Sequence, residues 1–303
     1  MFFITGDTHR DFSRFYKLKK DSNNMFIVLG DVGINYYLNE EDKNYKQLNL
    51  KLFCVRGNHE ERPENISTYK EVEMFSGKVF IEEEYPNLIF AKDGEAYNID
   101  GKKILVIGGA YSVDKQYRLL HGYKWFKEEQ LTKEEMDTIL AKVKGKHFDI
   151  VLTHTCPYKY EPREVFMQGL DQSKVDKSME HFLDEIEEKI SYDKWYCGHY
   201  HSEKQVDKLE FMFGRIKIFN KDEFGPKYNE NGYEIIRDYC KQDDINKDGK
   251  VWCSKCNSTD IVMQKGDGES IYGIDEIAII CKNCKKVYGF RDVKYKHNYP
   301  KEL

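Results

Sequence analysis

Five short apolar runs of this chain are each followed at once by side chains that can bind metal ions. The five junctions read Gly6-Asp7-Thr8-His9, Gly30-Asp31, Gly57-Asn58-His59-Glu60, Thr153-His154 and Gly198-His199-Tyr200-His201. The runs are rich in β-branched and aromatic residues and stop at glycine or at charged residues, which is typical of strands buried on both faces. The chain must therefore fold so that the ends of several buried strands carry polar groups.

Helix-like segments alternate with the apolar runs over the first two thirds of the chain. The predicted strands cover residues 2–5, 25–29, 52–55, 104–107, 150–153 and 195–197, and the predicted helices cover 39–50, 127–143 and 174–190. Two Asp-Gly turn signals predict a β-meander over residues 87–110, and residues 209–219 are expected to form a hairpin or a bent strand. The alternation of strands and helices favours the α/β fold class.

The polar groups that follow the runs are expected to meet at one edge of the fold. In an α/β sheet, side chains just beyond the carboxyl ends of parallel strands converge on one rim. The expected ligands are two carboxylates, one amide oxygen and four imidazoles, from Asp7, Asp31, Asn58, His9, His154, His199 and His201. Seven ligands are too many for one ion, and carboxylates with imidazoles but without thiolates suit Mn, Fe or Zn.

Two such ions would carry the chemistry of phosphate esters. A carboxylate can bridge two divalent ions about 3.5–4 Å apart, which then share a hydroxide and act on an in-line displacement. Two divalent ions, two carboxylates and one hydroxide leave a net charge of about +1 to attract a phosphoryl group. The sequence therefore predicts a site for phosphoester hydrolysis.

The same motifs resemble those of the calcineurin-like metallophosphoesterase family. That family carries Asp-x-His, Gly-Asp, Gly-Asn-His-Asp/Glu, His and Gly-His-x-His in this order, and the match extends over residues 1–219. A histidine after a strand or a Gly-Asp turn is, taken singly, more often structural than functional, but the complete set in family order is specific. The resemblance implies an α/β fold, a two-sheet β sandwich flanked by helices, with a dinuclear metal site at one edge.

The resemblance also implies a role for each matching residue. Asp7, His9 and His201 would hold the first ion, Asn58, His154 and His199 the second, and Asp31 would bridge the two. His59 matches the family's catalytic histidine, which helps to bind phosphate and protonates the leaving oxygen. Glu60 is expected either to orient a neighbouring imidazole or to face water.

One motif departs from the Ser/Thr protein phosphatase branch, which the segment Arg56-Gly57-Asn58-His59-Glu60 resembles. That branch continues Gly-Asp, after two residues, into Asp-Arg-Gly, but here Asp31 is followed by Val32-Gly33-Ile34-Asn35. This departure argues against protein phosphatase activity. The glycine-rich segment 108–115 resembles one in small bacterial and phage metallophosphoesterases. Arg118, just after it, is the expected phosphate ligand, with Arg62 as the second candidate, because a guanidinium matches phosphate oxygens.

Two Cys-x-x-Cys pairs near the end of the chain have the spacing of a structural zinc site. Cys253 and Cys256 are separated by 24 residues from Cys281 and Cys284. Four thiolates at such spacing are typical of a tetrahedral zinc site in a small zinc ribbon, and paired motifs outside a βαβ unit speak against a redox role. We therefore expect a metallophosphoesterase domain at residues 1–222, a linker at 223–248 and a zinc ribbon with a basic aromatic tail at 249–303.

The basic tail offers a second class of partner besides a phosphoester substrate. Its lysines and arginines alternate with Tyr288, Phe290, Tyr295 and Tyr299, as in a surface that binds nucleic-acid phosphates and stacks bases, and an ordinary solvated tail has the same composition. The whole chain carries a formal net charge of −5, which argues against general polyanion binding. Contact with nucleic acid is therefore expected, if at all, through the ribbon and its tail.

The sequence shows no membrane segment, because no apolar stretch is long enough to span a bilayer and the first residues lack a basic region followed by an apolar one. We expect a cytoplasmic protein with no membrane partner. Three functions remain open. They are a phosphoesterase that cleaves mono- or diesters with a metal-bridged hydroxide, a nuclease or nucleotide phosphodiesterase guided by the ribbon, and a binding or scaffold protein with a structural or regulatory metal site.

Overall fold

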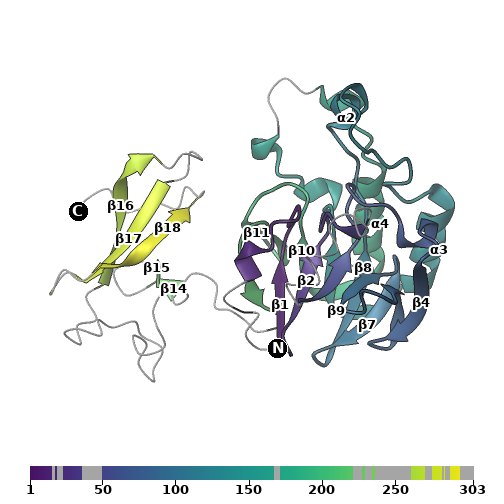
Figure 1. Ribbon diagram of the computed structural model, residues 1–303, viewed down its shortest axis with the longest axis horizontal. Coiled ribbons are helices and arrows are strands. Elements are labelled where there is room, and N and C mark those ends of the chain that lie inside the picture. Colours follow the sequence, from purple (N-terminus) through teal and green to yellow (C-terminus); the bar gives the residue numbers. More distant parts are fainter. Residues whose placement is uncertain are drawn as a thin grey trace. The chain divides into compact units, whose positions relative to one another are not determined.

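The fold is seen in a computed structural model of the 303-residue chain (Figure 1). The structure describes residues 1–15, 18, 23–35, 50–166, 171–220, 227–228, 234–235, 261–269, 275–281, 283 and 287–293. The chain divides into two compact units, Met1–Lys221 and Asp222–Leu303. All seven predicted ligands of the dinuclear site belong to the first unit.

The first sheet of this unit contains seven strands in the order β13-β1-β2-β3-β6-β5-β4. The strands are β1 (Phe2–Thr5), β2 (Met25–Leu29), β3 (Lys51–Val55), β4 (Tyr69–Met74), β5 (Gly77–Glu82), β6 (Leu88–Ala91) and β13 (Lys217–Ile218). Strands β1, β2, β3 and β6 run parallel. Their carboxyl ends therefore lie at the same edge of the sheet.

The second sheet contains six strands in the order β11-β12-β10-β9-β8-β7. The strands are β7 (Glu95–Ile99), β8 (Lys102–Ile107), β9 (His147–Thr153), β10 (Ser191–Cys197), β11 (Lys204–Val206) and β12 (Leu209–Phe211). Strands β8, β9, β10 and β12 run parallel, so this sheet also has an edge of carboxyl ends. The predicted α/β fold with two sheets and flanking helices is confirmed.

Apolar side chains fill the space between the two sheets. The central cluster joins Ile4, Ile27 and Phe53 of the first sheet to Val106 and Leu152 of the second, and all five are fully buried. The strands that lead to the polar groups are thus packed into a buried apolar core. This core fixes the strand ends relative to one another, which a metal site needs.

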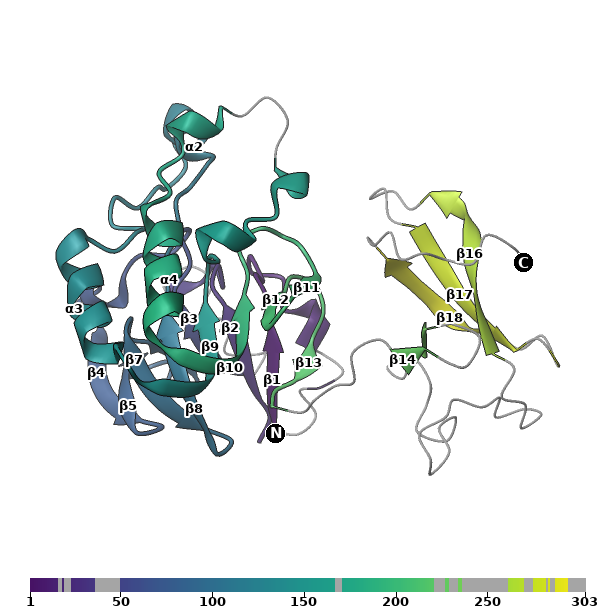
Figure 2. The same ribbon diagram turned by 180° about the vertical axis from the view of Figure 1, so that it is seen from behind.

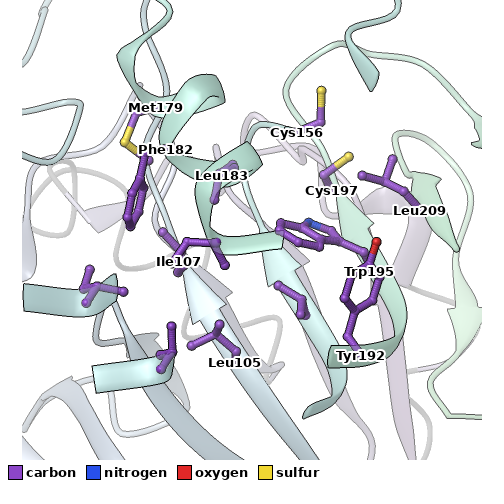
Figure 3. Packing of buried hydrophobic residues seen from close by; sticks show 14 of the residues in the cluster. Leu105, Ile107, Cys156, Met179, Phe182, Leu183, Tyr192, Trp195, Cys197 and Leu209 are labelled. Atoms are coloured by element: carbon purple, nitrogen blue, oxygen red, sulfur yellow. The ribbon is translucent and has the colours of Figure 1, made fainter. Parts of the chain in front are cut away.

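Two helices cover the outer face of the second sheet (Figure 2). They are α3 (Lys133–Val143) and α4 (Ser178–Lys189), and a shorter helix, α2 (Lys115–Leu120), lies apart from them. Side chains of α4, among them Phe182 and Leu183, pack over Ile107 and Trp195 (Figure 3). None of the helices in the described residues is long and apolar enough to cross a membrane.

Two predicted helices begin later than their sequence patterns suggested. The segment 127–143 becomes helical only at Lys133, because Thr132 and Glu135 form a capping box that starts the helix there. The segment 174–190 becomes helical at Ser178, whose backbone N–H donates to the Asp176 carboxylate. The predicted helix at 39–50 lies outside the described residues except for its last residue.

Several single turns of 3-10 helix complete the first unit. They are η1 (Ser13–Phe15), η3 (Pro63–Asn65), η4 (Tyr158–Tyr160), η5 (Arg163–Val165) and η6 (Gln172–Lys174). They lie in the segments between strands or between a strand and a helix. Such short connections keep the neighbouring elements close in space.

The predicted meander over residues 87–110 is wrong in one respect. Strand β6 belongs to the first sheet, whereas β7 and β8 pair in the second, so the chain crosses between the sheets at Asp93-Gly94. The segment 209–219 is likewise neither a hairpin nor a bent strand, because β12 lies in the second sheet and β13 in the first. A turn signal marks where a strand ends, but it does not say which sheet receives the next one.

The second unit contains a two-stranded and a three-stranded antiparallel sheet. Strands β14 (Lys227–Tyr228) and β15 (Glu234–Ile235) form the first, and β16 (Ile261–Glu269), β17 (Asp275–Cys281) and β18 (Val287–Val293) form the second. Cys281 is the last residue of β17. The predicted zinc ligands Cys253, Cys256 and Cys284, and the tail after Val293, lie outside the described residues.

Candidate metal centre

The predicted ligands come together at the carboxyl edge of both sheets. Each of them follows a parallel strand by a few residues. Asp7 and His9 follow β1, Asp31 follows β2, Asn58 and His59 follow β3, His154 follows β9, and His199 and His201 follow β10. The site is thus shared between the two sheets, and its geometry depends on how the sheets pack.

One cluster at this edge consists of Asp7, His9 and His201. One ligand atom from each lies within 4.8 Å of the other two. The Nε2 atoms of His9 and His201 are 2.9 Å apart. The ring of His201 stacks on Phe213, with 4.4 Å between ring centroids, which limits the orientations that this imidazole can take. The three side chains could therefore hold one metal ion.

A second cluster surrounds Asp31 and the fully buried His154. His154 Nε2 lies 2.8 Å from Asn58 Oδ1 and 3.6 Å from Asp31 Oδ1. The ring of His199 stands edge-on to that of His154, with 5.0 Å between centroids. Asp7, Asp31 and His154 also place ligand atoms within 4.8 Å of one another, so the two clusters share their carboxylates. The residues present fit two neighbouring cations.

In the contact between His154 and Asn58, two hydrogen-bond acceptors, Nε2 and Oδ1, face each other. His154 Nδ1 lies 2.7 Å from the carbonyl oxygen of Leu29, so in the neutral ring it is Nδ1 that carries the proton and Nε2 that does not. Asn58 faces Nε2 with its amide oxygen, because its amide nitrogen donates elsewhere. Two acceptors 2.8 Å apart repel each other unless a cation binds both, and the hydrogen bond from Nδ1 to Leu29 turns the lone pair of Nε2 toward such a cation.

A buried hydrogen-bond relay fixes the orientation of the Asn58 amide. Asn58 Nδ2 donates to Ser112 Oγ at 2.9 Å, and the Ser112 hydroxyl donates in turn to the Glu129 carboxylate. Glu129 also accepts from the Ser112 backbone N–H and from Trp125 Nε1. A carboxylate only accepts, so it sets the direction of the relay and turns Asn58 Oδ1 toward His154. Sequence analysis did not find Ser112 or Glu129; Ser112 lies within the glycine-rich segment, but no motif marks Glu129.

Replacement of Ser112 by alanine is expected to weaken one of two metal sites by about 10- to 100-fold, because the Asn58 amide loses the partner that holds its orientation. Titration of metal-free protein with Mn²⁺ by calorimetry measures this. The matched control is Ser191→Ala, an exposed serine that bonds His147 at the opposite end of the second sheet. Equal Mn²⁺ affinity in the wild type and Ser112→Ala would contradict the role of the relay.

The loops that carry the predicted ligands contain positive φ angles, which residues other than glycine rarely adopt. Asp31, His199 and His201 have φ values of 47°, 64° and 47°. Gly30, directly before Asp31, has φ 92°, and a Cβ atom there would lie 2.0 Å from His154 Nδ1. Only glycine fits this close approach. Strain of this kind is typical of functional sites, where the surrounding core holds the chain in place.

The two buried carboxylates influence each other strongly. Burial and the neighbouring charge of Asp31 raise the pKa of Asp7 well above its usual value. Burial would also raise the pKa of Asp31, but the positive charges that His154, His59 and His9 carry when protonated outweigh it and lower this pKa. Two carboxylates buried close together repel each other unless a cation lies between them. Their placement therefore favours a cation site.

The ligand imidazoles are held in the neutral form that binds metals. Burial lowers the pKa values of His9, His154 and His199. Burial and the neighbouring His9 lower the pKa of His201 to about 4. These rings are therefore neutral near pH 7 and carry free lone pairs for a cation.

His59 is partly exposed, whereas Asp31, the other predicted catalytic residue, is buried. Its side chain is 20% exposed, and its Nε2 atom lies 3.8 Å from Asp31 Oδ2. Its backbone N–H donates to Asp31 Oδ1 at 3.0 Å, which ties the loop to the centre of the site. The imidazole thus stands at the site with one side open to solvent.

Glu60 takes neither of the two roles expected for it. Its carboxylate is fully buried and accepts the backbone N–H groups of Gly33 at 3.0 Å and Gly57 at 2.6 Å. Burial and the charge of Asp31 raise the pKa of Glu60 to about 8. Glu60 therefore holds together the loops after β2 and β3, which carry Asp31 and Asn58.

The two predicted phosphate-binding arginines have different surroundings. The Arg62 guanidinium makes four hydrogen bonds, to both carboxylate oxygens of Glu135 and to the carbonyl oxygens of Glu128 and Gln130. Arg118 lies in α2, and its buried Nε has no hydrogen-bond partner among the described residues. The Asp114 carboxylate lies 3.5 Å from that atom. Arg118, unlike Arg62, keeps donors for a ligand.

A rim of buried carboxylates and neutral imidazoles on a two-sheet α/β fold is typical of metal-dependent hydrolases. Residues 1–203, about two thirds of the chain, match the model of the calcineurin-like phosphoesterase family. The chain therefore belongs to the calcineurin-like phosphoesterase family. Members of this family hydrolyse phosphoesters and bind two divalent metal ions. No curated protein sequence matches the chain.

Proposed function

We propose that this protein is a dinuclear phosphoesterase. Asp7, His9 and His201 would hold one ion, Asn58, His154 and His199 the other, and Asp31 both. The observation that carries this proposal is the 2.8 Å contact between two acceptors, His154 Nε2 and Asn58 Oδ1. Bound there, two divalent ions such as Mn, Fe or Zn would offset the charge of the phosphate oxygens and lower the pKa of a shared water.

The remaining polar groups of the site would serve the phosphoester itself. His59, partly open to solvent, would protonate the oxygen that leaves. Arg118 would bind a phosphate oxygen through its guanidinium, since its charge lies close enough to the site to contribute to the lowered pKa of His9. Both phosphomonoesters and phosphodiesters present non-bridging phosphate oxygens that the two ions and Arg118 would bind.

The test is turnover by the purified full chain, freed of metal with EDTA and then supplied with Mn²⁺. We expect hydrolysis of p-nitrophenyl phosphate or of bis-p-nitrophenyl phosphate, loss of both rates with EDTA, and recovery when Mn²⁺ is added back. If the protein binds two equivalents of Mn²⁺ but hydrolyses neither ester, the proposal fails, and a binding or scaffold protein with a regulatory metal site takes its place.

The pH dependence of turnover follows from the lowered pKa values of the ligand imidazoles. An imidazole binds a metal only when neutral, so binding is lost as the pH falls through its pKa. Because burial lowers the pKa of His201 from 6.5 to about 4, the loss should lie below pH 6.5. A profile of kcat/KM against pH, with metal content measured at each point and recovery checked at pH 7, tests this. A midpoint above pH 6.5 would exclude these imidazoles as the cause.

We also propose a structural zinc ion for the second unit, held by Cys253, Cys256, Cys281 and Cys284. Support comes from the spacing of the two Cys-x-x-Cys pairs and from the position of Cys281 at the end of β17. A closed four-thiolate site would stabilise a small β-sheet whose apolar core is limited.

A further inference from the structure

The segment around α2 is fastened to the metal centre at both of its ends. We call residues 113–124 the α2 arm. Ser112, just before the arm, and Trp125, just after it, both donate to the buried Glu129, and Ser112 also accepts from the predicted ligand Asn58. The arm stands beyond the carboxyl ends of the strands, at the end of the unit opposite to the N-terminus (Figure 1). Whatever binds to the arm is therefore held at a fixed place relative to the metal site.

The arm carries most of the large apolar side chains that the described residues expose. Five of the eight lie in it, from Val113 to Tyr123. Tyr117 and Tyr123 are each 56% exposed and Leu120 is 82% exposed, while no residue of α2 is buried. An exposed apolar cluster next to a catalytic site marks a surface that binds a ligand.

The C-terminal cap of α2 brings three rings of the arm together. Gly122 has φ 69°, and the backbone N–H of Tyr123 donates to the carbonyl of Arg118, which is the hydrogen bond of a Schellman motif. This turn brings Tyr123 back beside Tyr117, with 6.1 Å between ring centroids. His121 lies 4.1 Å from Tyr117 and, nearly parallel, 6.3 Å from Tyr123. The rings form a cluster with exposed aromatic surface.

The charge of the arm matches an anionic ligand. The arm contains one carboxylate, Asp114, and three cations, at Lys115, Arg118 and Lys124, in a chain whose net charge is negative. Arg118 lies in α2 one residue after Tyr117, and its Nε is 3.5 Å from the Asp114 carboxylate. Aromatic rings among cations are the pattern that binds single-stranded nucleic acid, whose bases stack and whose phosphates pair with the cations.

We propose that the α2 arm is a stacking platform for the nucleobases of a single-stranded nucleic acid, whose phosphodiester lies at the metal centre. This inference rests on the proposed function and names its substrate class. Arg118 binds the phosphate, and the rings of Tyr117 and Tyr123 stack the neighbouring base. A protein partner would use the same apolar atoms, but it gives no account of the three cations beside them.

The test compares the binding of two labelled oligomers of equal length, oligodeoxythymidylate and the same backbone with abasic sites, by fluorescence anisotropy in EDTA. The two have the same phosphate charge and differ only in their bases. We expect the full-length protein to bind the base-containing oligomer about tenfold more tightly or better. Tyr117→Ala combined with Tyr123→Ala is expected to remove this preference, and Tyr117→Phe combined with Tyr123→Phe to keep it.

Either of two results overturns the inference: equal affinity of the wild type for both oligomers, or a preference as large in the double alanine variant as in the wild type. The second unit is present in every protein compared, so the difference between the wild type and the double alanine variant reports on the arm alone. Both tyrosines are more than half exposed, so their loss leaves the core intact. Binding in EDTA does not depend on turnover, and hydrolysis of p-nitrophenyl esters does not depend on a nucleobase. Failure of this inference and failure of the proposed function are therefore distinguishable.

Discussion

Replacement of Asp31 by asparagine is expected to lower kcat for p-nitrophenyl phosphate with Mn²⁺ by at least about three orders of magnitude. Asp31 lies at the centre of the site, 3.6 Å from His154 Nε2 and 3.8 Å from His59 Nε2. Asparagine keeps the shape of the side chain and its Oδ1 can still accept the His59 backbone N–H, but the negative charge that would balance two cations is gone. The loss should therefore be one of catalysis and metal binding, with little loss of folding.

The matched control for this variant is Asp193→Asn, at an exposed carboxylate near the amino end of β10. It should hydrolyse the ester at the wild-type rate. The circular dichroism spectrum of metal-free Asp31→Asn should match that of the wild type and its thermal unfolding should stay cooperative, which shows that the fold is intact. A rate within tenfold of wild type in Asp31→Asn would show that the hydrolysis does not use this centre.

The convergence of the proposed metal ligands could be predicted from sequence because each follows its strand directly. Asp7, Asp31 and His154 lie within a few residues of a strand end, and parallel strands bring such positions to one edge without further information. The residues that orient the ligands could not be found in this way. Ser112 bonds Asn58 across 54 residues of sequence, and Glu129 bonds Ser112 across 17. These contacts depend on how the two sheets pack, which no local pattern encodes.

The sequence also does not show which polar side chains already make hydrogen bonds within the fold. Arg62 and Arg118 are both plausible phosphate ligands by type, but only the folded chain shows that Glu135 and two carbonyls occupy the guanidinium of Arg62. Glu60 is similar, because its role depends on two backbone N–H groups in different loops. The same limit applies to the crossing at Gly94, where a correctly predicted turn leads into the other sheet.

Replacement of His59 by glutamine is expected to lower kcat by about 10²–10⁴-fold for an alkyl phosphoester and by much less for p-nitrophenyl phosphate. An alkoxide is a strong base and needs a proton as it leaves, whereas p-nitrophenolate is stable without one. Glutamine has a similar length and leaves intact the hydrogen bond from the residue 59 backbone N–H to Asp31. The dependence on the leaving group therefore separates proton donation from binding or positioning of the phosphate.

His147→Gln serves as the control, because this exposed histidine pairs with Ser191 and Asp193 at the opposite end of the second sheet. Its rates with both esters should equal those of the wild type. If His59→Gln slowed both esters by the same factor, His59 would act on the phosphate oxygens and not on the leaving oxygen, and the proton would have to come from solvent. If it slowed neither, the imidazole that stands 3.8 Å from Asp31 would have no part in the reaction.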